Sequence, residues 1–145
     1  MISTNGDREL QFVDTNIMVY AHDRSAGDKH LRARDLVSQL WAANQGCLSI
    51  QVLQEFYVTA TRKGPMPLPV DTAIRVLQDL SSWHVHCPTV EDLIEAAKLQ
   101  HQYQLSYWDA LIIHSAKQMN CKVIWSEDFN TGQLYQGIPV RSPFP

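Results

Sequence analysis

The chain has 145 residues and a formal net charge of −3, and 45% of its residues are hydrophobic while 19% are charged. This balance indicates one folded domain rather than a disordered chain, and no apolar run approaches the roughly 20 residues that span a bilayer. The negative charge argues weakly against a nucleic-acid partner, which favours a basic protein face. If four acids gathered in one metal site, however, the remaining chain would carry +1, so charge alone leaves a nucleic-acid substrate open.

The N-terminal residues 1–9 are polar, and we expect them to form a flexible tail before a domain over residues 10–145. They lack the apolar core of an export signal, which predicts a cytoplasmic protein. The three cysteines, each in or beside an apolar strand-like stretch, are Cys47, Cys87 and Cys121. An odd number in such surroundings indicates reduced, buried thiols rather than a disulfide framework or a zinc site.

Short apolar strands alternate with amphipathic helices along the chain. In chain order, the predicted strands cover residues 10–13, 47–50, 83–87, 122–125 and 137–141. The predicted helices are one that begins near Thr15, one of about 17 residues that ends before a capping Gly46, and those over about 51–63, 70–82, 90–104 and 106–119. Such alternation is typical of a parallel sheet covered by helices on both faces.

Four acids stand where apolar segments meet. Asp14 directly follows the first predicted strand, and Asp128 follows the fourth. Glu55 borders the apolar stripe of one helix, and Asp109 lies in the first turn of another. An unpaired buried charge is costly, and ligands of open parallel sheets bind at the carboxyl ends of the strands. We therefore expect the four acids to converge on one crevice and to share a partner there.

Each acid alone also has an ordinary structural explanation. Asp14 could cap the helix that follows it, and Glu55 could lie on a solvated helix face. Asp109 could complete a capping box that Ser106 begins, and Asp128 could be a turn residue. The joint pattern, with two acids at strand ends and two beside apolar helix positions, is what favours a shared site.

Four segments resemble, in order, the acidic motifs of PIN-domain proteins. They are FVDTNIMVY (12–20), QEFY (54–57), LSYWDALI (105–112) and WSEDFNTGQ (125–133). The likeness runs from about Leu10 to Pro143 and is closest to the VapC-like toxin ribonucleases of bacteria. It implies a three-layer α/β/α sandwich with a central, mainly parallel sheet of about five strands.

The resemblance also implies a ribonuclease that depends on Mg²⁺ or Mn²⁺ and serves as the toxin of a VapBC-type toxin–antitoxin module. The acidic positions of the family fall on Asp14, Glu55, Asp109 and Asp128. Three of them are expected to bind the metal directly, and Glu55 through a water. The supporting polar positions fall on Thr15, Asn16 and Ser126. Oxygen ligands suit hard divalent cations, and a bound cation activates water for attack on a phosphodiester.

RNA is the substrate that the resemblance implies, and a cognate antitoxin and a second copy of the chain are the implied partners. The homodimer interface could use the segment GPMPLP (64–69) and its flanking helices. Basic residues that could contact RNA phosphates are Arg24, Arg62 and Lys63. Glu127 is a weaker ligand candidate, because alternation along the chain would turn it away from Asp128.

Other classes of protein fit less well. A haloacid-dehalogenase-type phosphatase needs a second acid two residues after the first, where this chain has Asn16. A receiver domain needs an acidic pair before that first acid and a lysine after the last strand, and both are missing there. The remaining alternative is a PIN fold without catalysis that binds RNA or protein, although all four acids are present.

Three histidines need separate explanations. His84 and His86 lie two residues apart and would share one face of a strand, which makes them a candidate metal pair, but no cysteine or carboxylate stands at a matching spacing. His114 lies five residues after Asp109 and so on a different helix face, and we expect it in the core or at an interface.

Overall fold

The computed structural model describes residues 9–62 and 64–145. Within them one sheet has the strand order β3-β2-β1-β4-β6-β5. Its strands are β1 (Gln11–Val13), β2 (Gly46–Ser49), β3 (His84–His86), β4 (Val123–Trp125), β5 (Leu134–Tyr135) and β6 (Ile138–Arg141). Every neighbouring pair is parallel except β5 with β6. Strand β1 therefore lies between β2 and β4, in the centre of the parallel part of the sheet.

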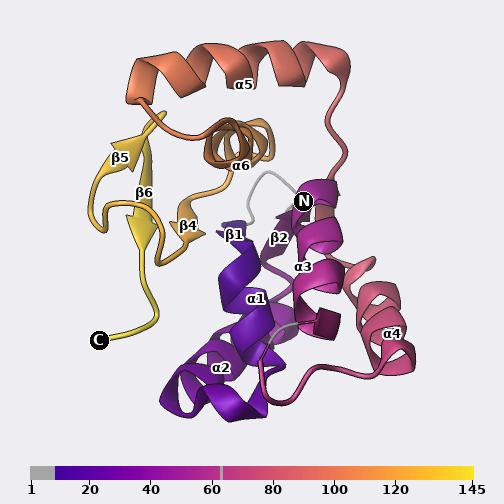
Figure 1. Cartoon of the computed structure of the whole chain (residues 1–145). Coiled ribbons are helices and arrows are strands. Elements are labelled where there is room, and N and C mark those ends of the chain that lie inside the picture. Colours follow the sequence, from indigo (N-terminus) through magenta and orange to yellow (C-terminus); the bar gives the residue numbers. More distant parts are fainter. Residues whose placement is uncertain (1–8, 63) are drawn as a thin grey trace, which may run out of the picture.

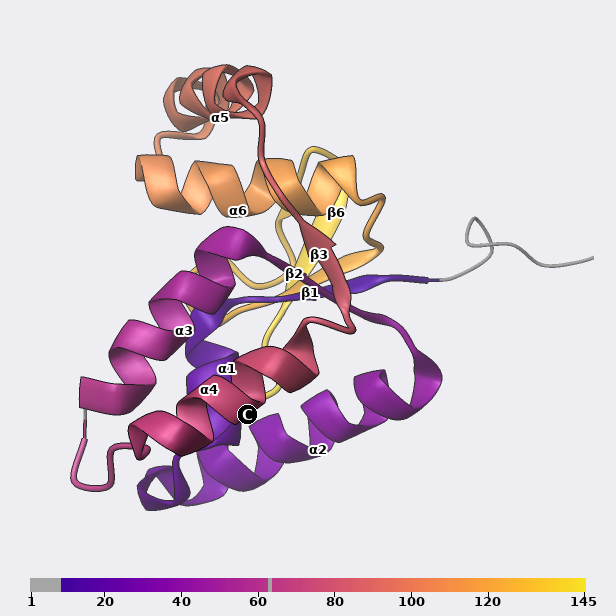
Figure 2. The ribbon, with the colours of Figure 1, turned by 90° about the vertical axis from the view of Figure 1, so that its right-hand side faces the viewer.

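Helices cover both faces of this sheet. They are α1 (Thr15–Ala21), the 3₁₀ helix η2 (Arg24–Ala26), α2 (Asp28–Ala43), α3 (Ile50–Arg62), α4 (Val70–Leu80), α5 (Val90–Tyr103) and α6 (Tyr107–Gln118). Figures 1 and 2 show α1 to α4 on one side of the sheet and α6 on the other, with α5 packed outside α6. The predicted three-layer α/β/α sandwich with a mainly parallel sheet is confirmed.

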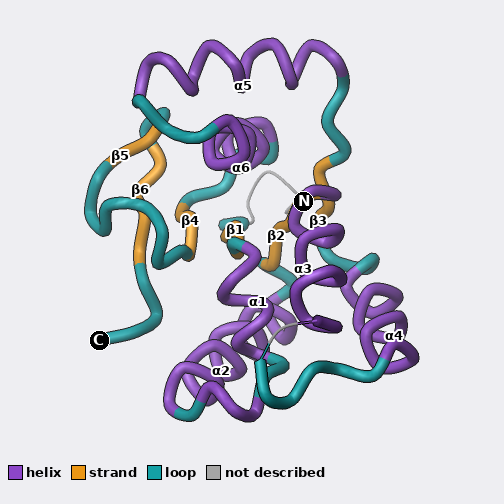
Figure 3. The backbone as a smooth tube through the Cα atoms, in the orientation of Figure 1, coloured by secondary structure: helices purple, strands orange, loops and turns teal. Residues whose placement is uncertain are grey.

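The central strands are buried from both sides, which explains why they are apolar at consecutive positions. Phe12, Val13, Leu48 and Ile124 have no exposed surface. Figure 3 shows β1, β2 and β4 in the middle of the molecule, between α6 and the helices α1 and α3. A parallel strand covered on both faces needs no polar side, so apolar residues can follow one another along it, as Phe12 and Val13 do.

The sheet has one strand more than the five that the sequence predicts. β5 pairs with β6 in an antiparallel hairpin, and the turn between them contains Gln136 with φ 52° and Gly137 with φ 80°. Two consecutive residues with positive φ are typical of a tight hairpin turn. A strand of two residues, Leu134–Tyr135, is too short to show an alternating pattern, which is why sequence periodicity does not reveal it.

Gly46 has a different role from the helix cap that the sequence predicts. Helix α2 ends at Ala43, and Asn44 adopts the left-handed conformation with φ 55° and caps it, as asparagine can. Gly46 instead begins β2, where a Cβ would stand 2.3 Å from a ring carbon of Trp83. Close packing against an aromatic ring, rather than a turn, therefore requires this glycine.

The three cysteines are free thiols. Cys47 and Cys121 are buried, as predicted, whereas Cys87 is exposed, so the prediction for Cys87 is wrong. The reason is that β3 ends at His86, before the cysteine.

Within the described residues, no helix has the length and apolar character needed to cross a membrane. The expected tail at residues 1–9 lies outside the described residues except for its last position.

Candidate active site

Asp14 occupies the point where β1 ends and α1 begins. Its backbone has φ −72° and ψ 160°, and its Oδ1 accepts a hydrogen bond of 2.7 Å from the Thr15 N–H. Its Oδ2 accepts a second bond of 2.7 Å from the Ser126 hydroxyl. Only 6% of the residue is exposed. Asp14 therefore caps the helix and also stands beside the loop that leaves β4, so the structural and functional explanations of this residue are compatible.

Glu55 is tied to the start of α1 rather than standing free on a helix face. Its Oε1 accepts a 2.7 Å hydrogen bond from the Thr15 hydroxyl, and its Oε2 lies 3.4 Å from the Gln51 amide nitrogen. Gln51 and Glu55 are four residues apart on α3 and so share one face of the helix. Thr15 thus connects the first two acids, because its N–H binds Asp14 and its hydroxyl binds Glu55.

Asp109 lies in the first turn of α6, as predicted. Ser106 caps this helix, and its hydroxyl accepts a 3.1 Å hydrogen bond from the Asp109 N–H. At the start of α5, by comparison, Thr89 and Asp92 bind each other in both directions as a complete capping box. Asp109 lines a cavity with the other acids, and the Ser106 hydroxyl lowers the pKa of its carboxyl group.

Asp128 is the second residue after Ser126 in the loop that leaves β4. The Asp128 N–H donates to the Ser126 hydroxyl at 3.0 Å, and the Asp128 Oδ2 accepts a 3.1 Å bond from the Asn16 amide. Ser126 has no exposed surface and contacts both Asp14 and Asp128. The polar residues Thr15, Asn16 and Ser126 therefore hold three of the four acids in place.

The four acids surround one cavity of about 440 Å³. They come from separate parts of the chain, at the ends of β1 and β4 and in helices α3 and α6. Thr15, Asn16, Gln51 and Trp108 also line this cavity. It lies at the carboxyl ends of the central parallel strands, where ligands of open α/β sheets bind.

Burial and neighbouring negative charges make Asp14, Asp109 and Asp128 hard to ionise. Burial raises the pKa of Asp14 to about 7, against the hydrogen bonds from Ser126 and Thr15 that lower it, and the charges of Asp128 and Asp109 add to the rise. Burial also raises the pKa of Asp109, against a hydrogen bond from Ser106 that lowers it, and the charges of Asp128 and Glu55 add to the rise. The pKa of Asp128 is raised by burial and by neighbouring Glu127. A cation in the cavity would relieve this cost.

The donors in the cavity suit a hard divalent ion. Within residues 9–62 and 64–145, no three His, Cys, Asp or Glu side chains form a ready-made metal cluster, which is consistent with carboxylates spread around a wide cavity. Mg²⁺ commonly uses one or two carboxylates and keeps several of its waters. Such a hydrated ion needs space as well as oxygen ligands, and the four-acid cavity offers both.

Glu127 does not line the cavity. Its Oε1 accepts a 2.6 Å hydrogen bond from the Tyr20 hydroxyl, and its Oε2 lies 2.9 Å from the Lys29 ammonium. Burial would raise the pKa of Glu127, but the bonds from Lys29 and Tyr20 outweigh it and lower the pKa. The side chain points away from the site of Asp128, in agreement with the alternation argument.

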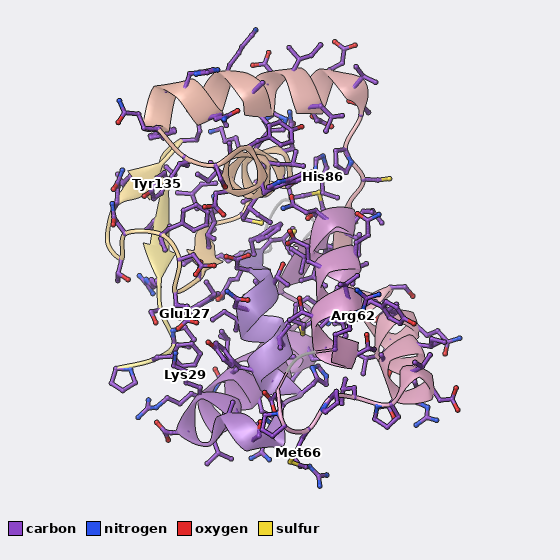
Figure 4. The ribbon with its side chains drawn as sticks, viewed as in Figure 1. Lys29, Arg62, Met66, His86, Glu127 and Tyr135 are labelled. Atoms are coloured by element: carbon purple, nitrogen blue, oxygen red, sulfur yellow. The ribbon has the colours of Figure 1, made fainter. Side chains whose placement is uncertain are left out.

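His84 and His86, the candidate metal pair, contact different parts of the protein. His84 Nε2 lies 3.3 Å from the Asn44 carbonyl, whereas His86 Nδ1 lies 2.8 Å from the Ser115 hydroxyl. His86 and His114 both face Asp92, at 3.4 Å and 2.8 Å. Figure 4 shows His86 beneath α5 and beside α6. His114 is 6% exposed and therefore a core residue, as expected.

Two of the three predicted RNA-binding residues, Arg24 and Arg62, can be placed relative to the acids. Arg24 lies in η2 and Arg62 is the last residue of α3 (Figure 4). Neither lines the four-acid cavity. Lys63 lies outside the described residues. Any contact of Arg24 or Arg62 with RNA would therefore be to nucleotides away from the position of the acids.

Gln51 is a residue of the cavity that the sequence analysis missed. It is 7% exposed, and its amide nitrogen lies 3.2 Å from the Trp108 carbonyl in addition to its bond to Glu55. Its Oε1 is buried and has no hydrogen-bond partner among the described residues. The spacing of four residues from Glu55 was the available signal, since it predicts a shared helix face.

The chain matches a known family of protein domains. The PIN domain family model matches residues 12–135, and the chain therefore belongs to the PIN-domain family. No curated protein matches its sequence significantly.

Among solved structures, this chain is similar to the VapC20 toxin of Mycobacterium tuberculosis, which cleaves the sarcin–ricin loop. The two are 20% identical with a TM-score of 0.63, over 81% of this chain and 91% of the toxin. A toxin–antitoxin complex from Klebsiella pneumoniae gives 21% identity and a TM-score of 0.65, over 92% and 98%. DNA-bound VapBC from Salmonella typhimurium gives 15% and 0.65, over 93% and 98%. The fold is thus the one that VapC toxins have.

Proposed function

We propose that this protein is a metal-dependent endoribonuclease and the toxin of a VapBC-type toxin–antitoxin module. The observation that carries the proposal is the convergence of Asp14, Glu55, Asp109 and Asp128 on one cavity at the carboxyl ends of β1 and β4. The likeness to VapC toxin structures supports it. We place the activity in the cytoplasm, where RNA and an antitoxin would both be present.

In this proposal Asp14, Asp109 and Asp128 hold Mg²⁺ or Mn²⁺, and Glu55 contributes through a water. The bound ion would polarise a phosphoryl oxygen and lower the pKa of a water in the site. Asp14 must first give up its proton, because burial raises its pKa to about 7. Ser126 keeps the Asp14 carboxylate oriented by donating to Oδ2, and Asn16 does the same for Asp128.

Glu55 has the position of a residue that orients a water. The hydrogen bonds from Thr15 and Gln51 reach both of its carboxylate oxygens and leave further lone pairs for the cavity side. A water that Glu55 aligns with the phosphorus would attack the phosphodiester in line. The new P–O bond would form as the bond to the 3′ oxygen breaks, and that oxygen would take up a proton, so that a 5′-phosphate and a 3′-hydroxyl result. The Glu55 carboxylate would also be a proton acceptor for that water.

Partners follow from the same proposal. The related structures from Klebsiella pneumoniae and Salmonella typhimurium are complexes with antitoxins, and we propose an antitoxin for this chain as well. A homodimer remains our expectation. Three apolar residues in or next to residues 64–69 and α4 support an interface there, since Met66, Val70 and Ile74 are 53%, 51% and 43% exposed.

The test is cleavage of RNA by the purified chain with Mg²⁺ or Mn²⁺, with EDTA as the control. Asp14→Asn should abolish cleavage because it removes a negative charge that holds the cation. Melting curves should show that Asp14→Asn remains folded. Cleavage that persists in both EDTA and Asp14→Asn would refute the mechanism. RNA binding without cleavage by the wild type would indicate the non-catalytic alternative instead.

A further inference from the structure

Glu127 uses both of its carboxylate oxygens in contacts that lead away from the cavity. Tyr20 on α1 donates to one oxygen at 2.6 Å, and Lys29 on α2 forms an ion pair with the other at 2.9 Å. Figure 4 shows Glu127 and Lys29 close together, beside α1 and the start of α2. This three-residue group, which we call the Glu127 clasp, joins the loop after β4 to two helices.

Lys29 has two aromatic neighbours in addition to its ion pair with Glu127. Its ammonium lies 5.0 Å from the centre of the Tyr20 ring and 5.2 Å from that of Phe144. The two rings contact each other edge to face at 5.4 Å. An isolated surface ion pair contributes little because its side chains are free to move, whereas two aromatic faces restrict Lys29 to the position that meets Glu127.

The clasp acts on the same segment that carries Asp128. Ser126 donates to Asp14, Glu127 binds Tyr20, and Asp128 accepts from Asn16. Asn16 and Tyr20 are four residues apart on α1 and so share one face of that helix. Three consecutive residues of the loop are therefore fastened along α1, and a shift of the middle one must displace its neighbours.

Charge makes the clasp matter for Asp128 in particular. Glu127 is a carboxylate directly adjacent in sequence to an acid of the cavity, and Lys29 supplies the positive charge that balances it. Without Lys29, the repulsion between Glu127 and Asp128 would be stronger, and Glu127 would lose the ion pair that holds it on the side of α2. With Lys29 and Tyr20 in place, both Glu127 oxygens are held on the side of α1 and α2, although the Glu127 charge still raises the pKa of Asp128.

We propose that Glu127, held by Tyr20 and Lys29, is a positioning residue that sets where the Asp128 carboxylate stands in the four-acid cavity. The proposal rests on the proposed function for the role of Asp128 as a metal ligand. It differs from a role of Glu127 as a ligand, because both Glu127 oxygens are already bound outside the cavity.

The variants for the test are Lys29→Met, which removes the charge, Tyr20→Phe, which removes the hydroxyl, and Lys29→Arg, which keeps the charge. Lys98→Met is the matched control, because Lys98 forms an exposed 3.2 Å ion pair with Glu95 on α5. Two quantities are measured for each protein: the affinity for Mn²⁺ by calorimetry, and the amide exchange rate of the 126–129 segment by mass spectrometry.

Lys29→Met and Tyr20→Phe should each weaken Mn²⁺ binding by about three- to tenfold, less than the roughly 10–100-fold typical of partners that contact a metal ligand directly. Both should speed exchange in the 126–129 segment, and higher Mn²⁺ concentrations should restore RNA cleavage by raising occupancy. Lys29→Arg and Lys98→Met should resemble the wild type in both measurements.

Unchanged exchange in this segment for both Lys29→Met and Tyr20→Phe would overturn the proposal. So would faster exchange with unaltered Mn²⁺ affinity, since the clasp would then be structural only. A wild type that binds no Mn²⁺ would refute the proposed function, and the positioning role would fall with it. If Asp14→Asn abolishes Mn²⁺ binding while Lys29→Met and Tyr20→Phe leave it unchanged, the proposed function stands and only the positioning role is refuted.

Discussion

Replacing Asp14 by Asn should remove a pH dependence of stability that the metal-free wild type has. The pKa of Asp14 rises from its ordinary value of 3.8 to about 7 in the folded protein, chiefly through burial. The folded protein therefore holds this proton more tightly than the unfolded chain does. The free energy of unfolding must then fall as the pH rises from about 4 to about 7, and this contribution is fully present only below about pH 4.

The size of the effect follows from the shift. One pKa unit corresponds to about 1.4 kcal/mol, so the whole rise of Asp14 is worth about 4 kcal/mol. Between pH 5 and pH 8, the contribution of Asp14 to the free energy of unfolding falls by about 3 kcal/mol, which is most of the total. Asn does not titrate, and any change in its hydrogen bonds with Ser126 and Thr15 adds an offset that does not depend on pH.

Urea denaturation in EDTA at pH 5 and pH 8 measures the difference. Subtracting the free energies of unfolding of the two proteins removes most of the contribution of Asp109 and Asp128, which both retain. The difference between wild type and Asp14→Asn should change by about 3 kcal/mol between the two pH values, with the wild type losing more stability. Parallel pH profiles for the two proteins would refute the reasoning, because they would show that Asp14 ionises as easily in the fold as in the unfolded chain.

Two further predictions concern residues that support the site and the sheet. Ser126→Ala should raise the pKa of Asp14 further, because the Ser126 hydrogen bond lowers it. When Mn²⁺ affinity is measured against pH, its loss on acidification should then begin at a higher pH in this variant. An unchanged profile would show that Ser126 does not influence the ionisation of Asp14. Gly46→Ala should destabilise the protein by about 1–3 kcal/mol in urea denaturation, the typical cost of overpacking, because its Cβ would stand 2.3 Å from the Trp83 ring; an unchanged midpoint would mean that the ring yields freely.

Much of the fold could be predicted because its signals are local. Consecutive apolar residues mark the buried central strands, and the capping box of Thr89 and Asp92 marks the start of α5. The β5 strand could not be predicted, because two residues carry no periodicity. The end of α2 could not be placed correctly either, since both Asn44 and Gly46 can terminate a helix, and only the contact of Gly46 with Trp83 distinguishes them.

The site shows the same division between local and distant information. The positions of the four acids at strand ends and helix starts are visible in the sequence, and the structure gathers them around one cavity. The partners of Glu127 are not visible, because Tyr20 and Lys29 lie 107 and 98 residues away along the chain. Gln51 is intermediate, since its spacing from Glu55 is local while its contact with Trp108 depends on how α3 and α6 pack.

Crystals of the protein soaked in Mn²⁺ would test the central claim most directly, through the anomalous scattering of the ion. We predict a peak in the four-acid cavity, at direct ligand distance from at least two of the carboxylates of Asp14, Asp109 and Asp128, and its loss in Asp14→Asn. A cavity without a peak at saturating Mn²⁺, or a peak only elsewhere, such as between His86 and Asp92, would contradict the claim that these acids form a metal site.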